Sequence, residues 1–172
     1  MTKEELARFC STDETRINIV TPWSKDEYSF ATNGHLIVRV PRLVDVPERD
    51  AAPSGDKLFP YKEPPEWVRL SDMEIPEAVR ADCSECNGDK TIMHDDCSDC
   101  NGHNCPECNG KGEVIVDRIP VPVGTGHFQL AYLHMLKELP NCKIGPNADP
   151  MDHAVFQFDG GDGLLMPMKH YV

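Results

Sequence analysis

Six of the eight cysteines form three Cys-x-x-Cys pairs near the middle of the chain: Cys83 with Cys86, Cys97 with Cys100, and Cys105 with Cys108. Two thiolates separated by two residues can bind one metal ion, and a tetrahedral zinc site then needs two more ligands. Each pair is followed by Asn-Gly, and glycine lets the backbone turn tightly behind the sulfur atoms at positive φ. The spacing therefore predicts metal-binding knuckles.

The simplest pairing joins the two outer knuckles, so that one zinc ion is bound by Cys83, Cys86, Cys105 and Cys108. Around the central knuckle, potential ligands recur at every third position: His94, Cys97, Cys100 and His103. This second set could bind a second zinc ion, or its histidines could be solvated loop residues. A zinc ion with four protein ligands has no open position for water, so we expect a structural rather than a catalytic metal.

Disulfide bonds and redox chemistry are the alternatives to a metal site. The chain starts with the charged run MTKEELARFC, and no stretch of it has the roughly 18 apolar residues that span a membrane. We therefore expect a cytoplasmic protein, in which reduced thiols favour metal binding over disulfides. A thioredoxin-like site would need a Cys-x-x-Cys at a strand–helix junction, which the sequence does not predict. Cys10 and Cys142 adjoin apolar residues and are expected to be buried, unreactive thiols.

Charge and length limit the possible functions. The formal net charge is −12, from 29 acidic and 17 basic residues. This charge disfavours non-specific binding to nucleic acid. The 172 residues suffice for one sizeable core and a small appendage. The sequence has no nucleophile motif, phosphate loop or His-Glu-x-x-His site, so no catalytic residues and no organic cofactor are expected. The chain is therefore not expected to be an enzyme.

The segments on either side of the cysteines read as helices followed by antiparallel strands. Thr2 and Glu5 form a capping box, and Asn33-Gly34 lies between two alternating runs that predict a hairpin. Apolar residues at helical spacing, from Phe128 to Leu139, predict a second helix. Residues 154–168 read as two strands around a glycine turn. The sequence thus predicts an α+β fold.

Four segments are predicted from these patterns. Residues 1–55 and 114–172 form two related helix-plus-sheet halves, and residues 56–80 form a proline-rich connection. Residues 81–113 form a cysteine-rich, zinc-binding insertion between the halves.

Two families share motifs with this chain. The run CPECNGKG resembles the Cys-x-x-Cys-x-Gly-x-Gly repeats of the zinc domain of DnaJ-type co-chaperones, over residues 83–112. The flanks resemble the bacterial DNA polymerase III β sliding clamp, whose motifs are matched by FATNGHLIVRV in the first half and by Phe128, Tyr132, Leu133 and Met166–Lys169 in the second. Asn33 stands where the clamp motif has aspartate, and only three cysteine repeats are present.

The clamp resemblance implies a single DNA-clamp-like domain interrupted by the zinc module, and a bacteriophage genome is its expected source. It implies a non-enzymatic protein that acts through a protein partner, in or against DNA replication. A clamp ring needs about six such domains with basic inner helices, so the acidic charge predicts a monomer or small oligomer with weak or no DNA binding. Met166 and Met168 are two residues apart, so they lie on the same face of the predicted final strand, and we expect both to be buried against the second helix.

Two other functions fit the same residues. An acidic protein could occupy the DNA-binding site of a host nucleic-acid-binding protein as a decoy. The DnaJ-like knuckles could instead belong to a chaperone-like or peptide-binding zinc protein.

Overall fold

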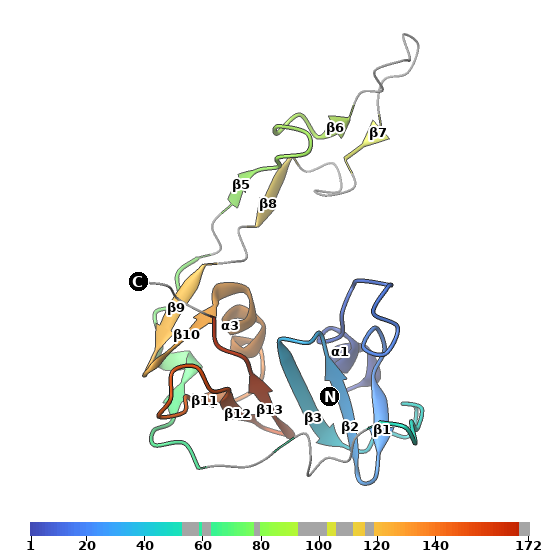
Figure 1. The fold of residues 1–172 in the computed structure, drawn as a ribbon, viewed down its shortest axis with the longest axis vertical. Coiled ribbons are helices and arrows are strands. Elements are labelled where there is room, and N and C mark those ends of the chain that lie inside the picture. Colours follow the sequence, from blue (N-terminus) through green and yellow to red (C-terminus); the bar gives the residue numbers. More distant parts are fainter. Residues whose placement is uncertain are drawn as a thin grey trace. The chain divides into compact units, whose positions relative to one another are not determined.

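The structure is a computed structural model that describes residues 1–52, 59, 63–77, 80–92, 103–105, 112–115 and 119–168. The chain divides into two compact units (Figure 1): unit 1 comprises Met1–Ile75 and Pro120–Val172, and unit 2 comprises Pro76–Ile119. The described residues combine a seven-stranded antiparallel sheet with few helices, a mixed α and β architecture that agrees with the predicted α+β class.

The seven-stranded sheet forms the centre of unit 1, with strand order β1-β2-β3-β13-β12-β11-β4. Its strands are β1 Trp23–Lys25, β2 Tyr28–Thr32, β3 Leu36–Pro41, β4 Val68–Arg69, β11 Lys143–Gly145, β12 Ala154–Phe158 and β13 Gly161–Leu165. Two antiparallel meanders, one from each end of the sequence, meet where β3 pairs with β13 (Figure 1). The sheet therefore brings residues 36–41 and 161–165 side by side.

The first hairpin has the turn that the sequence predicts. Strands β2 and β3 pair from Tyr28 opposite Pro41 to Thr32 opposite Ile37. Gly34 has a φ of 92°, a conformation that favours glycine, and the side chain of Asn33 accepts hydrogen bonds from the backbone amides of His35 and Leu36 at 2.9 and 3.1 Å. The Asn-Gly prediction is confirmed.

The last hairpin, β12 with β13, is also confirmed, and it needs a glycine inside a strand. Gly163 lies opposite Phe156 in β12 and Val38 in β3. A Cβ atom at this position would collide with the Phe156 ring and with the carbonyl oxygen of Ile37. Gly163 therefore lets the fully buried Phe156 lie across the strand, in the middle of the sheet.

The first helix, α1 Lys3–Ala7, has the predicted capping box. The Thr2 hydroxyl accepts the amide of Glu5 at 3.3 Å, and the Glu5 carboxylate accepts the amide of Thr2 at 2.7 Å. Leu6 is fully buried and Phe9, just beyond the helix, is 3% exposed. A short helix is thus held on the core by two apolar side chains.

The second helix is shorter than predicted, and its buried face is different. Gly126–Gln129 forms strand β10, which pairs with β9 Pro120–Val123, and helix α3 spans only Leu130–Lys137. The residues that α3 buries are Leu130, Leu133 and Leu136. Phe128 is buried from the strand, and Ala131 is only partly buried. The prediction was wrong here because alternation in the strand continues into a helical repeat, and apolar residues alone do not mark the change.

The prediction that Met166 is buried against α3 is wrong. Met166 lies just beyond β13 and is 51% exposed, and Met168 is only partly buried. The backbone amide of Met166 donates to the carbonyl of His35 at 2.8 Å, and that of Met168 to the carbonyl of His127, also at 2.8 Å. These bonds hold the segment by its main chain, which leaves the Met166 side chain at the surface. Lys169 lies outside the described residues.

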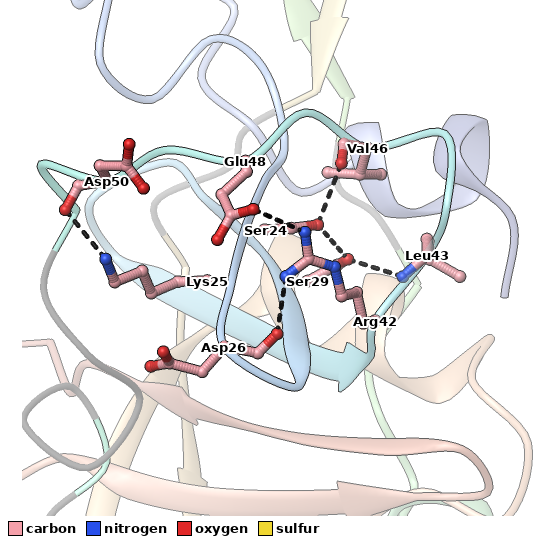
Figure 2. Close-up of polar contacts among 9 residues, drawn as sticks. All are labelled: Ser24, Lys25, Asp26, Ser29, Arg42, Leu43, Val46, Glu48 and Asp50. Carbon is pink, nitrogen blue, oxygen red and sulfur yellow. Dashed lines mark hydrogen bonds and ion pairs between the residues drawn. The ribbon is translucent and has the colours of Figure 1, made fainter.

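A long loop, residues 42–50, is tied to the first two strands by a buried pair of hydroxyls (Figure 2). Ser24 and Ser29 are both fully buried, with their oxygens 2.7 Å apart. Ser24 donates to the carbonyl of Val46 at 3.1 Å, and Ser29 accepts the amide of Leu43 at 2.9 Å. Two polar side chains in the interior thus fix the course of the loop.

Unit 2 contains two short antiparallel ribbons among its described residues. β5 Arg80–Asp82 pairs with β8 Glu113–Ile115, and β6 Thr91–Ile92 pairs with β7 His103–Asn104. The segment between β5 and β6 carries the first cysteine knuckle, and Cys105 directly follows β7. The ribbons bring the two ends of the cysteine-rich segment together.

Candidate metal centre and binding pocket

Three thiols of unit 2 form a candidate metal centre. The sulfur atoms of Cys83, Cys86 and Cys105 all lie within 4.8 Å of one another, and those of Cys83 and Cys105 are 3.7 Å apart. The exposed fractions of the three residues are 0%, 5% and 0%. Sulfur atoms around a tetrahedral zinc ion, each about 2.3 Å from the metal, have separations of this order. The donor set therefore suits zinc.

The backbone around the thiols follows the predicted knuckle geometry. Asn87 and Gly88, directly after the first pair, have φ angles of 48° and 86°. The amide of Cys83 donates to the carbonyl of Gly112 at 2.8 Å, and that of Cys105 donates to the carbonyl of Lys90 at 2.9 Å. The first bond joins the Cys83–Cys86 knuckle to Gly112, and the second joins Cys105 to the segment that follows this knuckle.

Gly112 is required where these segments meet. Its φ is 78°, and a Cβ atom at this position would lie 2.5 Å from the carbonyl oxygen of Gly88. A side chain would be strained by the φ angle and would push the first knuckle away from Gly112. The close approach of Gly112 to Gly88 therefore keeps the two backbone segments near enough to bring Cys83 and Cys105 together.

The burial pattern gives a physical reason to expect a metal. Among the residues of unit 2 whose burial the structure describes, the buried hydrophobic residues are Cys83, Cys86 and Cys105, and they form one cluster. By themselves, these three thiols bury too little apolar surface to offset the conformational entropy of ordering the described segments of unit 2. A metal ion held by thiolates supplies folding free energy to small domains of this kind.

The structure brings three of the four predicted ligands of this site close to one another. Cys83, Cys86 and Cys105 come together, and Cys108 lies outside the described residues. Of the second set, His94, Cys97 and Cys100 also lie outside them, and His103 begins strand β7. The second zinc site stays a prediction. A disulfide does not join Cys83 to Cys105, because their separation is far above the roughly 2 Å of an S–S bond.

The two remaining cysteines are buried in unit 1, as predicted. Cys10 and Cys142 are 9% and 5% exposed, and both are free thiols. Burial raises the pKa of Cys142 from 9.0 to about 12. Burial also raises the pKa of Cys10, against the opposing effects of a hydrogen bond to the backbone of Thr32 and of the Arg49 charge. Neither thiol ionises readily at neutral pH, so both are inert core residues.

A pocket in unit 1 was not predicted from the sequence. Its volume is about 700 Å³, within the range of roughly 300–1,000 Å³ typical of ligand-binding pockets. Residues from four parts of the chain line it: Asn18, Ile19 and Trp23; Thr32 and Gly34–Ile37; Arg49, Ala51 and Ala52; His153, Leu164 and Met166. Most of these are apolar, and Met166 supplies a half-exposed side chain to the lining.

Trp23 and Arg49 form the polar part of the pocket wall. Trp23 is 5% exposed and stacks on Phe30, with ring centroids 5.7 Å apart. The guanidinium of Arg49 lies over the Trp23 ring, 5.3 Å from its centroid, and donates a hydrogen bond to the Asn18 carbonyl. The buried indole nitrogen of Trp23 has no hydrogen-bond partner among the described residues.

Two histidines complete the polar lining. The His35 ring stacks on Tyr132, with centroids 6.0 Å apart. The Nδ1 atom of His153 lies 2.8 Å from a carboxylate oxygen of Asp152. The pocket wall thus presents hydrogen-bond donors and aromatic rings around an apolar floor.

The pocket was missed because no local pattern encodes it. Its residues are spread from Asn18 to Met166 and meet through the pairing of β3 with β13 and the attachment of the 42–50 loop to the sheet. One signal was present: Pro167 comes directly after the last strand, and a proline there often marks the point where the chain leaves the sheet.

Comparisons of the chain with protein-family models, with curated proteins and with solved structures find no significant match. Within the described residues, no helix has the length and apolar character needed to cross a membrane.

Proposed function

We propose that this protein is a non-enzymatic, sliding-clamp-like binding protein that acts through protein contacts in or against DNA replication. In this proposal, unit 1 carries the contact site, and unit 2 is a module held together by zinc. Cys83, Cys86, Cys105 and Cys108 bind the structural zinc ion, and the central knuckle provides a second site.

The observation that carries the proposal is where the clamp-like motifs lie. Gly34 and His35 belong to the motif near the start of the chain, and Met166 belongs to the motif near its end. All three line the same 700 Å³ pocket. Residues shared with the clamp family thus contribute to a surface that can bind a partner as well as to the core.

The lining suits a short apolar segment of another protein. Ile19, Leu36, Leu164 and Met166 offer aliphatic and thioether groups, and Trp23 offers an aromatic face. Burying apolar side chains in such a pocket contributes about 25 cal/mol per Å² of surface removed from water. Methionine adapts to different partners because its unbranched side chain is flexible and polarisable.

A matched pair of variants tests the contact site. Met166 lines the pocket and Met151 does not, yet both side chains are 51% exposed. Either Met→Glu change therefore adds one surface charge with little effect on the core. We expect wild type and Met151→Glu to retain replication proteins from a bacterial extract, and Met166→Glu to lose them.

Three results would contradict the proposal. Equal retention by all three proteins would show that the pocket is not the contact site. Retention that is unchanged by Met166→Glu but is lost when salt is added would favour the acidic decoy, because salt screens interactions between exposed charges. Suppression of aggregation of an unfolded client by the wild-type protein, without any replication protein retained, would favour the chaperone-like alternative.

A further inference from the structure

The dipeptide Asn-Gly occurs at the first hairpin turn and after each Cys-x-x-Cys pair, with its asparagines at Asn33, Asn87, Asn101 and Asn109. Asparagine in this context can modify itself. The backbone nitrogen of the glycine attacks the side-chain carbonyl carbon of the asparagine, and a cyclic succinimide forms as ammonia leaves with the proton of that nitrogen. Water then opens the ring to aspartate or to isoaspartate, in which the main chain runs through the former side chain. Glycine favours the attack because it has no side chain to hinder its nitrogen.

Asn33, in unit 1, is held against this reaction. Ring closure turns the glycine nitrogen toward the asparagine side chain, so the hydrogen bonds of the turn must break first. The Gly34 amide donates to the Thr32 hydroxyl at 3.0 Å, and the Asn33 side chain accepts two backbone amides. The backbone carbonyl of Asn33 accepts a hydrogen bond from Arg16 at 2.8 Å. The peptide bond between Asn33 and Gly34 is therefore fixed on both sides.

Asn87, in unit 2, has fewer restraints of its own. Its side chain is exposed and has no hydrogen-bond partner within the described part of the chain. The Gly88 amide donates to the carbonyl of Cys83 at 3.3 Å, which is longer than usual for such a bond. This turn directly follows Cys83 and Cys86, two of the three clustered thiols. Its conformation therefore depends on the metal that the thiols bind.

From this contrast we infer that Asn87 is a site of spontaneous deamidation that becomes reactive when unit 2 loses its metal, and that the isoaspartate product no longer binds metal. The inference rests on the zinc site of the proposed function and adds a modification that follows metal loss. With the metal bound, Asn87 and Gly88 are kept at φ angles of 48° and 86°. Without it, the described residues of unit 2 bury little that could hold this turn, so the glycine nitrogen is free to reach the side chain.

The geometry of the knuckle explains why the product would fail to bind metal. Isoaspartate adds one methylene group to the main chain directly after Cys86. The carbonyl oxygen of Gly88 already lies so close to Gly112 that a Cβ atom there would approach it to 2.5 Å. A longer chain displaces Gly88, and with it Gly112, whose carbonyl accepts the Cys83 amide at 2.8 Å. The thiols of the two segments then no longer meet.

The test follows deamidation in zinc-loaded protein and in protein stripped of metal with a chelator, both incubated at neutral pH in water labelled with heavy oxygen. Peptide mapping by mass spectrometry measures each Asn-Gly separately, and the label identifies rings that opened during the incubation. In metal-free protein, Asn87 should convert at least about tenfold faster than Asn33, because a segment that loses its fold also loses its protection. With zinc bound, Asn87 should convert more slowly by a similar factor, and the rate at Asn33 should be unchanged.

Zinc is then returned to the incubated protein, and zinc-bound and zinc-free molecules are separated by ion-exchange chromatography. Isoaspartate at position 87 should be confined to the zinc-free fraction. Asn87→Gly adopts the φ of 48° without strain and has no side chain to cyclise, so it should regain more zinc than the wild type after the same incubation. Freshly purified Asn87→Asp is the matched control, since it adds the charge without lengthening the main chain, and it should bind zinc like the wild type.

The possible failures are distinct. Full zinc content with equal conversion of Asn87 in the two samples, or isoaspartate at position 87 in the zinc-bound fraction, would overturn this inference and leave the zinc site of the proposed function intact. Fresh Asn87→Asp that does not bind zinc would also overturn it, because charge rather than chain length would then prevent binding. Failure of freshly purified wild-type protein to take up zinc would count against both the inference and the zinc site.

Discussion

Replacing Cys83, a proposed zinc ligand, should destabilise unit 2 and leave the stability of unit 1 unchanged. In Cys83→Ser, a hydroxyl replaces a thiol that is fully buried and lies 3.7 Å from the sulfur of Cys105. Serine is a poor ligand for zinc, so we expect one equivalent of metal to be lost. Binding of a structural zinc ion is worth about 10–16 kcal/mol in small zinc domains, as much as the roughly 5–15 kcal/mol that stabilises a typical domain.

The described residues of unit 2 offer little burial to replace that contribution. Its described buried hydrophobic residues are three cysteines, so without metal the ribbons β5–β8 and β6–β7 should lose their protection against hydrogen exchange. The sheet of unit 1 should keep its protection, because its core is built from other residues, among them Phe30, Phe156 and Leu133.

Cys142→Ser is the matched control for this variant. Cys142 is also buried, at 5% exposure, but it belongs to unit 1 and is not part of the thiol cluster. Burying a hydroxyl there should cost about 1–3 kcal/mol and leave the metal content unchanged. Elemental analysis and amide exchange measured by mass spectrometry report both quantities. A Cys83→Ser protein with full metal content, or with unit 2 still protected, would refute the reasoning.

Three further predictions concern unit 1 and DNA. Because burial raises the pKa of Cys142 from 9.0 to about 12, the native state holds this proton more tightly than the unfolded state. The stability that this pKa difference contributes is complete below pH 9.0 and is lost as the pH rises to about 12. In urea titrations, the free energy of unfolding of Cys142→Ala should therefore fall less steeply with rising pH than that of the wild type. Equal slopes for the two proteins would contradict this. Gly163→Ala should cost more than about 2 kcal/mol, since its Cβ collides with Phe156 and Ile37. At Gly160 the φ is 97° and an added Cβ would have no atom within 4 Å, so Gly160→Ala should cost about 1–2 kcal/mol. Equal urea midpoints of unfolding for the two variants would count against the packing argument. Sedimentation should show a monomer or small oligomer, and fluorescent duplex DNA should bind no more tightly than about micromolar at physiological salt. A stable hexamer, or nanomolar binding that weakens steeply with salt, would reverse that expectation.

Local patterns predicted the parts of the fold that local interactions stabilise. The Thr2–Glu5 capping box and the Asn33-Gly34 turn each involve residues close in sequence, and both occur as predicted. The first cysteine knuckle is of the same kind, since a Cys-x-x-Cys pair followed by Asn-Gly makes its own turn. Pairing Cys83 with Cys105 needed one further assumption, that two half-sites complete one tetrahedron.

The helix boundary near Gln129 shows where local reasoning failed. Phe128 and Leu130 are both buried, one from strand β10 and the other from helix α3. Hydrophobicity gives the same signal for both residues, and the hydrogen bonds between β10 and β9 decide where the strand ends.

By itself, the sequence determined the α+β class, the hairpins and the type of metal ligand, because each follows from backbone preferences or from the chemistry of the thiol. Only the tertiary structure decided that Met166 stays at the surface and that His35, Arg49 and Leu164 share one pocket. These residues lie far apart along the chain and meet because β3 pairs with β13 and because buried serines hold the 42–50 loop on the sheet. Strand pairing over such distances depends on the packing of the whole core, which no short segment contains.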